Sequence, residues 1–177
     1  HRGKTVDIGS EMQGMLQALK HRGPDSTGYA LYGEGSKGDY ILRFKVGENV
    51  KEGSTAANEE KAVYDERRKQ VDKFIRDLGA DILQDQQLTP YSFRYVIKYD
   101  KDLMEFSKKI ESVDMTEILS LGKTLELVKD IGDASAVSKQ YGLDKIKGTH
   151  AIGHSRMATE SGVDIRSAHP FWGYPFS

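Results

Sequence analysis

The sequence has 177 residues, of which 37% are hydrophobic and 30% are charged, and its formal net charge is −1. A chain of this length can bury a substantial core, and a net charge near zero does not favour binding to nucleic acid or to an anionic membrane surface. No apolar run is long enough to span a bilayer, and the absence of cysteine excludes disulfides, thiolate metal sites and a cysteine nucleophile within these residues.

The first predicted element is a helix that begins near Ser10. Ser10 and Gln13 have the spacing of a capping box. The apolar positions that follow at helical spacing on one face are Met12, Met15, Leu16 and Leu19. Gly23 and Pro24 are typical of a helix end, so we expect the helix to stop before them.

Two strands are expected after this helix, over residues 29–32 and 39–46. The glycines between them, at positions 33, 35 and 38, indicate the turn of a hairpin. This stretch lacks the spacing of a phosphate-binding loop and leads into a strand rather than a helix. We therefore interpret it as a flexible hairpin tip.

The middle of the chain predicts an α+β segment. The expected elements are a helix over 59–78, a strand over 91–99, a helix over 100–113, strands over 115–121 and 124–131, and a short helix capped by Asp133 and ended by Gly142. A helix is the alternative for 115–121. The order of these elements indicates a compact α+β insertion over 91–142, or alternatively a separate small domain.

A strand that begins at Gly148 carries the strongest chemical signal. Period-two geometry places His150, Ile152, His154 and Arg156 on one face of this strand. Arg156 leads into a loop that is rich in hydroxyl side chains, and a guanidinium matches the two oxygens of a carboxylate. We interpret Arg156 as a carboxylate clamp, the alternative being a structural arginine paired with an acid of the same chain.

Two other chemistries were weighed for this strand. The Cα atoms of His150 and His154 are about 13 Å apart along a strand, too far for one metal ion, so we expect no metal site. Ser155 and His169 are candidates for a serine hydrolase pair, but Ser155 lacks the turn motif of such a nucleophile. The residues themselves therefore indicate a carboxylate clamp and no nucleophile.

Two motifs resemble those of the class II glutamine amidotransferases, which are N-terminal-nucleophile hydrolases. The first is His21-Arg-Gly-Pro-Asp-Ser-Thr-Gly28, between a helix and a strand, and the second is Gly153-His-Ser-Arg-Met-Ala-Thr159, followed by Ala168-His-Pro-Phe171. Their spacing, with the segment 91–142 between them, is most similar to amidotransferase subunits related to glutamate synthase. The motifs cover the two ends of the chain.

The resemblance implies an α+β fold, a four-layer αββα sandwich that would be incomplete here. It also implies hydrolysis of the glutamine side-chain amide through a thioester, with ammonia passed to a synthase subunit or domain. By resemblance, Arg156 binds the substrate carboxylate, Thr159 and the backbone near Glu160 assist, and Met157 lines the substrate wall. Supporting roles around the site fall to Arg22, Asp25 and His169.

The sequence departs from the family in lacking the N-terminal cysteine and the oxyanion segment that would follow the aromatic C-terminus. We therefore expect a fragment that is inactive alone, with the cysteine on a strand upstream of His1. The alternative is a non-catalytic module that binds glutamine or docks on a partner. No residue pattern indicates a flavin or nucleotide cofactor, nucleic acid or a membrane as a partner, and a cytoplasmic location is expected.

Overall fold

The computed structural model describes residues 4–22, 25–36, 39–48, 56–157 and 168–173. Its first sheet has the strand order β6 (Leu125–Ile131), β1 (Ser26–Gly33) and β7 (Gly148–Arg156). The second has the order β3 (Asp81–Gln87), β4 (Ser92–Lys98), β2 (Tyr40–Lys45) and β5 (Glu117–Gly122). All recorded strand pairs are antiparallel.

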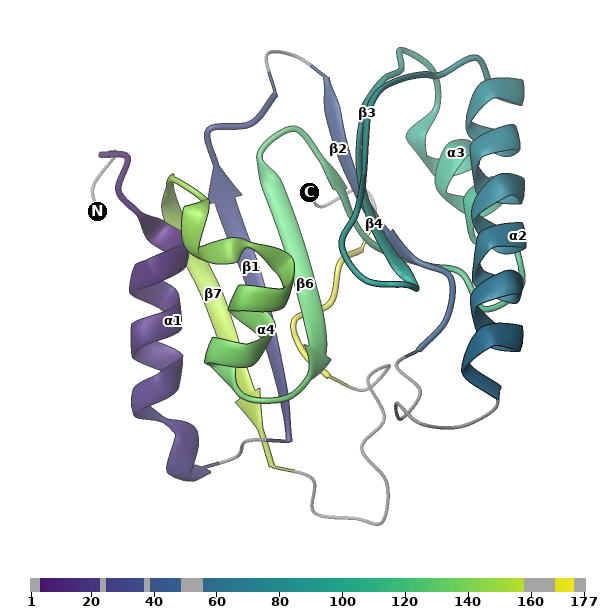
Figure 1. Ribbon diagram of the computed structural model, residues 1–177. Helices are drawn as coiled ribbons and strands as arrows, with labels where there is room; N and C mark the ends of the chain where they lie inside the picture. The colour runs from purple at the N-terminus through teal and green to yellow at the C-terminus, as the bar shows by residue number, and fades with distance from the viewer. Residues whose placement is uncertain (1–3, 23–24, 37–38, 49–55, 158–167, 174–177) are drawn as a thin grey trace.

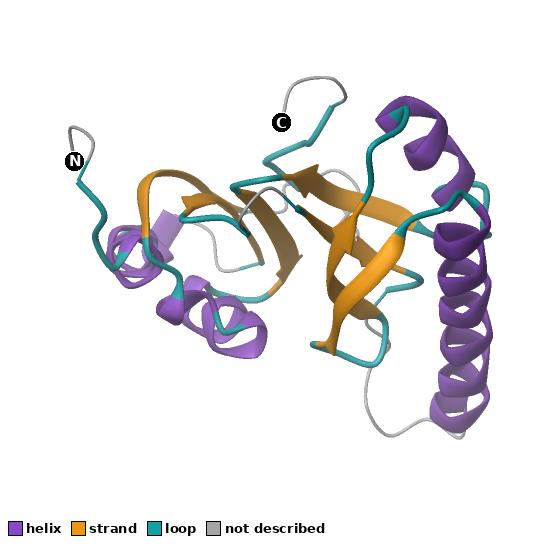
Figure 2. Ribbon diagram, turned by 90° about the horizontal axis from the view of Figure 1, so that it is seen from above, coloured by secondary structure: helices purple, strands orange, loops and turns teal. Residues whose placement is uncertain are grey.

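The two sheets lie between two pairs of helices (Figure 2). The helices α1 (Ile8–Ala18) and α4 (Ala134–Tyr141) lie beside the first sheet, and α2 (Ala56–Asp77) and α3 (Leu103–Ile110) lie beside the second (Figure 1). The described part is therefore α+β and is compatible with the predicted αββα sandwich. None of the described helices has the length and apolar character needed to cross a membrane.

Each sheet buries alternate side chains against its own helices. Tyr29 and Leu31 of β1 belong to a core cluster with residues of α1 and α4. Leu42 and Phe44 of β2 belong to a larger cluster with residues of α2 and α3. The intervening residues of these strands face the other way, as the two-residue period of a strand requires, and Ala30 packs in a small apolar cluster with residues of β5 and β6.

The first helix differs from its prediction in where it begins. Val6 exchanges two 2.9 Å backbone hydrogen bonds with Gly148, so the chain is extended until Val6 and α1 begins two residues later. Ser10 therefore lies inside the helix and its hydroxyl donates to the carbonyl of Asp144 at 3.0 Å, and the predicted capping box is wrong. Of the predicted stripe, Leu16 is buried, whereas Met15 is 61% exposed.

The predicted hairpin between residues 29–32 and 39–46 is also wrong. Both strands form, but β1 pairs with β6 and β7, whereas β2 pairs with β4 and β5. Both edges of β1 are occupied, so β2 has no free edge there to join. The turn between them instead contacts the β5–β6 turn, where Gly33 N–H donates to the carbonyl of Thr124 at 2.8 Å.

The middle of the chain follows the prediction more closely. The strands β4, β5 and β6 and the helices α2, α3 and α4 form within the expected ranges or within a few residues of them. For 115–121, the predicted strand is confirmed and the alternative helix is not. Asp133 accepts a hydrogen bond from Ala136 N–H at 3.0 Å, and Gly142 ends α4 with φ of 62°. The segment 91–142 contributes strands to both sheets, and its status as an insertion stays a prediction.

One strand, β3, was not predicted. It forms the edge of the second sheet, and nearly all its residues are exposed. Its sequence Asp-Ile-Leu-Gln-Asp-Gln-Gln has no regular apolar alternation, because an edge strand with little buried surface does not need one.

A buried ion cluster joins the sheets. Glu126 of β6 is paired with Arg43 of β2 at 2.7 Å and with Arg94 of β4 at 2.7 Å. Burial alone would raise the pKa of Glu126, but the two guanidinium groups outweigh it and lower this pKa to about 2. Removing one partner of such a cluster leaves buried charge without compensation.

We expect Glu126→Gln to lower the free energy of unfolding by about 3 kcal/mol. The folded-state pKa is below the unfolded value, so the contribution of Glu126 is complete above about pH 4.5 and is lost as the pH falls towards 2. Urea titrations at pH 7 and pH 3 should therefore show a larger difference between wild type and variant at pH 7.

The matched control is Glu66→Gln. Glu66 is exposed and its contact with Lys69 is 4.0 Å long, so the change should be below about 0.5 kcal/mol. Equal effects of the two substitutions would contradict the assigned role of Glu126.

Candidate functional site

The candidate site lies where β1 begins and its neighbours β6 and β7 end. Ser26 of β1 is in register with Arg156 of β7 on one side and with Ile131 of β6 on the other. The N–H of Asp25 donates to the carbonyl of Arg156 at 3.2 Å, and the carbonyl of Asp25 accepts from Gly132 N–H at 3.0 Å. Asp25, directly before β1, is therefore fixed to the ends of both neighbouring strands.

The face of β7 that carries Arg156 points away from the first helix. A Cβ atom added to Gly153 would lie 2.6 Å from the sulfur of Met12 and 2.8 Å from a methyl carbon of Leu16, so Gly153 faces α1. By alternation, His154 and Arg156 face the opposite side. The predicted strand is confirmed.

A second row of residues lies two residues further along β1, on the same face of the sheet. Gly28 is in register with Lys129 of β6 and His154 of β7. A Cβ atom on Gly28 would lie 1.8 Å from the carbonyl oxygen of His169, so the turn at 168–170 is seated directly on the strand where a side chain is missing.

Aromatic rings continue this row on both sides of the seated turn. The ring centroid of His169 is 5.0 Å from that of His154 and 4.7 Å from that of Phe171. Lys129 Nζ lies 4.8 Å from the centroid of Phe171. The turn thus bridges β6 and β7 across β1, directly beside the row that carries Arg156.

The electrostatics place positive charge near His154. Burial, the His169 imidazole and the Arg156 guanidinium together hold the pKa of His154 below its usual value. A neutral imidazole can accept or donate a hydrogen bond. The face therefore offers a permanent cation, Arg156, beside a histidine that favours its neutral form.

The structure brings together some of the predicted site residues. Arg156, Asp25 and His169 lie at this end of the first sheet, and Met157 follows β7 with 51% of its surface exposed. Arg156 is half-buried and is engaged in an interaction within the chain. Its proposed partner, a substrate carboxylate, stays a prediction.

Three predicted residues cannot be placed in the same way. Thr159 and Glu160 lie outside the described residues. Arg22 ends the 3-10 helix η1 (Lys20–Arg22), but its side chain is not among those described. Their roles also stay predictions.

The first motif contains Ser26, but the sequence analysis assigned no role to Ser26 and did not point to Lys129. Ser26 is 1% exposed, and within the described chain its hydroxyl has no hydrogen-bond partner. Only the pairing of β1 with β6 and β7 places these two residues beside Arg156 and His154. A local sequence pattern carries no information about that register.

The two alternative chemistries find no support in the geometry. Ser155 alternates with Arg156 and so faces the α1 side, whereas the His169 ring makes an edge-to-face contact with His154 on the other side. His150 stacks on Tyr32 with a centroid distance of 4.1 Å, so the two strand histidines have separate ring partners. No three His, Asp or Glu side chains of the described ranges form a group that could hold a metal ion.

We expect Arg156→Ala to raise the pKa of His154, because one of the nearby cations that lower it is removed. An NMR titration of the imidazole signals measures this pKa. Arg76→Ala, on the exposed face of α2, is the control and should leave the pKa unchanged. An unchanged pKa in Arg156→Ala would place the guanidinium away from this face.

We expect Gly28→Ala to displace the seated turn, since the added methyl carbon would overlap the His169 carbonyl. The free energy of unfolding should fall by about 1–3 kcal/mol, and the NMR signals of His154 should shift. Gly14→Ala is the control, because a Cβ atom there meets nothing within 4 Å and alanine favours a helix. A Gly28→Ala variant as stable as wild type would contradict the seating.

Comparison with known proteins places this geometry in context. The sequence matches no protein-family profile. It is 33% identical over 176 residues to the "Putative glutamine amidotransferase" of Methanothermobacter thermautotrophicus, an alignment that covers 97% of this chain and 54% of that protein. It is 25% identical over 169 residues to the "Glutamine amidotransferase-like protein GlxB" of Rhizobium meliloti, covering 93% and 49% respectively.

A shorter match is 34% identical over 77 residues to the isomerizing "Glutamine--fructose-6-phosphate aminotransferase" of Methanococcus maripaludis, covering 42% of this chain and 13% of that protein. The chain spans about half the length of the first two relatives. Along nearly all of its own length, it is similar to proteins named as glutamine amidotransferases.

Proposed function

We propose that this chain is the glutamine-binding part of a class II glutamine amidotransferase domain. The observation that carries the proposal is the pairing of β1 with β7, which brings Ser26 of the first motif into register with Arg156 of the second. The two motifs are far apart in the sequence and form one end of one sheet. The names of the relatives support the same reading.

In this proposal, Arg156 holds the α-carboxylate of glutamine. A guanidinium presents paired N–H donors that fit both carboxylate oxygens, and such charge-assisted pairs are among the stronger hydrogen bonds. Thr159 and the backbone near Glu160 assist, and Met157 lines the wall beside the substrate. Fixing the carboxylate aims the side-chain amide, and such positioning contributes several kcal/mol to catalysis.

The supporting residues act on the shape of the site. Asp25 is tied to Arg156 and Gly132 through backbone hydrogen bonds, and Arg22 ends the 3-10 helix that precedes it in the chain. His169 forms the rim, held by Gly28 beneath it and by His154 beside it. None of these groups is assigned a chemical step.

The reaction implied by this assignment is hydrolysis of the glutamine amide by a cysteine through a thioester, with transfer of ammonia to a glutamate-synthase-like partner. The sequence contains no cysteine, so in this proposal the thiol comes from outside these 177 residues. Binding of glutamine, rather than turnover, is what this chain itself should perform.

We expect wild type to bind glutamine in isothermal titration calorimetry and Arg156→Ala to lose at least about tenfold in affinity, because a charged hydrogen bond is worth about 1.5–3 kcal/mol. Arg156→Lys should fall between the two, since lysine keeps the charge but not the paired donors. Arg76→Ala controls for the loss of a surface arginine. Unchanged affinity in Arg156→Ala would overturn the proposal.

The second candidate is a module that binds glutamine without hydrolysing it, which the absence of cysteine favours for this chain. An ammonia-release assay on the longer protein that contains this chain separates the two candidates. Ammonia release that depends on Arg156 supports the enzyme. Glutamine binding without ammonia release supports the module.

A further inference from the structure

The seated turn and the residue that follows it contact the first sheet on both sides of Gly28. Lys129 of β6 and His154 of β7 are in register with Gly28. Neighbouring strands are about 4.8 Å apart, so these two residues lie about 10 Å apart across β1. His169 meets the ring of His154 at one end of this distance, and Phe171 meets the ammonium of Lys129 at the other.

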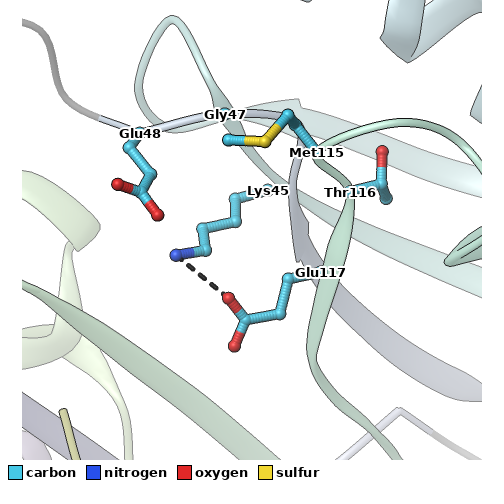
Figure 3. A pocket seen from close by; sticks show the side chains of 6 residues that line it. All are labelled: Lys45, Gly47, Glu48, Met115, Thr116 and Glu117. Atoms are coloured by element: carbon cyan, nitrogen blue, oxygen red, sulfur yellow. Dashed lines mark ion pairs between the residues drawn. The ribbon is translucent and has the colours of Figure 1, made fainter. Parts of the chain in front are cut away.

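The second sheet fixes the ammonium of Lys129. The Lys129 side chain is 2% exposed, and its Nζ lies 2.9 Å from one oxygen of Glu117 at the start of β5. The other oxygen of Glu117 is paired with Lys45 Nζ at 3.0 Å (Figure 3). Burial raises the pKa of Glu117, but Lys129 and Lys45 outweigh it and lower this pKa, so the carboxylate stays ionised.

The ring of Phe171 lies against this buried cation. Its centroid is 4.8 Å from Lys129 Nζ and 4.7 Å from the ring centroid of His169, although 57% of Phe171 is exposed. A cation–π contact changes an equilibrium by about 2- to 30-fold, and the upper end applies to a cation that is shielded from water. The contact with Lys129 is therefore strong enough to decide where this exposed ring lies.

Two other side chains also hold this segment. Ala168 is 1% exposed, and Trp172 packs against two of the apolar core clusters. They lie on either side of the stretch 169–171. If they alone determined the position of the turn, Lys129 would contribute an ion pair to stability and nothing to the site.

We propose that Lys129 is a positioning residue of the glutamine site. Its ammonium, held by Glu117, fixes the ring of Phe171 and thereby keeps His169 against His154 at the rim. This inference rests on the proposed function and adds to it a residue that acts through the turn, without a chemical step of its own. Through Glu117, it also makes the shape of the rim depend on the second sheet.

The position of the turn is tested with Lys129→Met, which removes the ammonium and leaves the pair between Lys45 and Glu117. The imidazole of His169 is one of the groups that lower the pKa of His154, so a displaced turn should raise this pKa. An NMR titration of the imidazole signals measures it. Lys129→Arg keeps a cation at this position and should keep the wild-type value, whereas a wild-type value in Lys129→Met would overturn the proposal.

Lys45→Met is the matched control. The Lys45 side chain is 5% exposed and is paired with the same carboxylate, so both variants lose one buried ion pair and should be less stable to urea. The contact with Phe171 belongs to Lys129. We therefore expect Lys45→Met to leave the pKa of His154 unchanged. Equal rises in the two variants would mean that only the ion pair matters, against the proposal.

Phe171→Leu tests the same contact without a change of charge and leaves both buried ion pairs in place. It should also raise the pKa of His154, and the double variant with Lys129→Met should show no larger rise than the larger single effect. Additive rises would show that the two residues act separately and would reject the proposal. If Lys129→Met does not fold, an unchanged pKa in Phe171→Leu rejects it instead.

Glutamine affinity, measured by calorimetry, tests the consequence for the site. Lys129→Met and Phe171→Leu should weaken binding by about threefold or more, and Lys129→Arg and Lys45→Met should bind as wild type does. Wild-type affinity in variants with a raised His154 pKa would refute the positioning role in binding. If wild type does not bind glutamine, the proposed function fails, and the His154 titrations still decide whether Lys129 positions the turn.

Discussion

The hydrogen bonding of β1 on both edges is the constraint on which the rest of the candidate site depends. It fixes Ser26 between Ile131 and Arg156, and Gly28 between Lys129 and His154. A slip of one residue would move every side chain of the strand to the other face. The same occupied edges send β2 into the second sheet, so this pairing also decides the division of the chain into two sheets.

Charge pairs occupy much of the space between the sheets. Glu126 joins Arg43 and Arg94, and Glu117 joins Lys45 and Lys129, so each carboxylate bridges two cations. The faces that meet the helices are instead apolar clusters. Ion pairs have stricter geometry than apolar contacts, so these clusters position the second sheet relative to the end of β1.

Local patterns in the sequence predicted local structure. The alternation of β7 and the caps of α4 need only neighbouring residues, and both are confirmed. The pairing of strands is a competition for edges between distant segments, which explains the wrong hairpin. The polar strand β3 has no apolar pattern to detect, and the start of α1 is set by the distant Gly148. Where the structure differs from the prediction, the cause is therefore the sheet in which a segment lies or a contact with a segment distant in the sequence.

In the candidate site too, some residues could be identified from the sequence, whereas others could be identified only from the pairing of the strands. Arg156 could be selected from the sequence because a guanidinium at a strand end has a distinct chemistry, and the motifs around it resemble a known family. Ser26 and Lys129 gain meaning only from the register. His154 was placed on the right face, but the sequence could not show that the turn carrying His169 is seated beside it.

The most direct measurement is a crystal structure of the protein with bound glutamine. The account predicts that the α-carboxylate of the ligand lies within hydrogen-bond distance of the Arg156 guanidinium, at the end of β7 beside Asp25. It would be contradicted by a guanidinium directed away from the ligand, or by glutamine bound elsewhere on the chain.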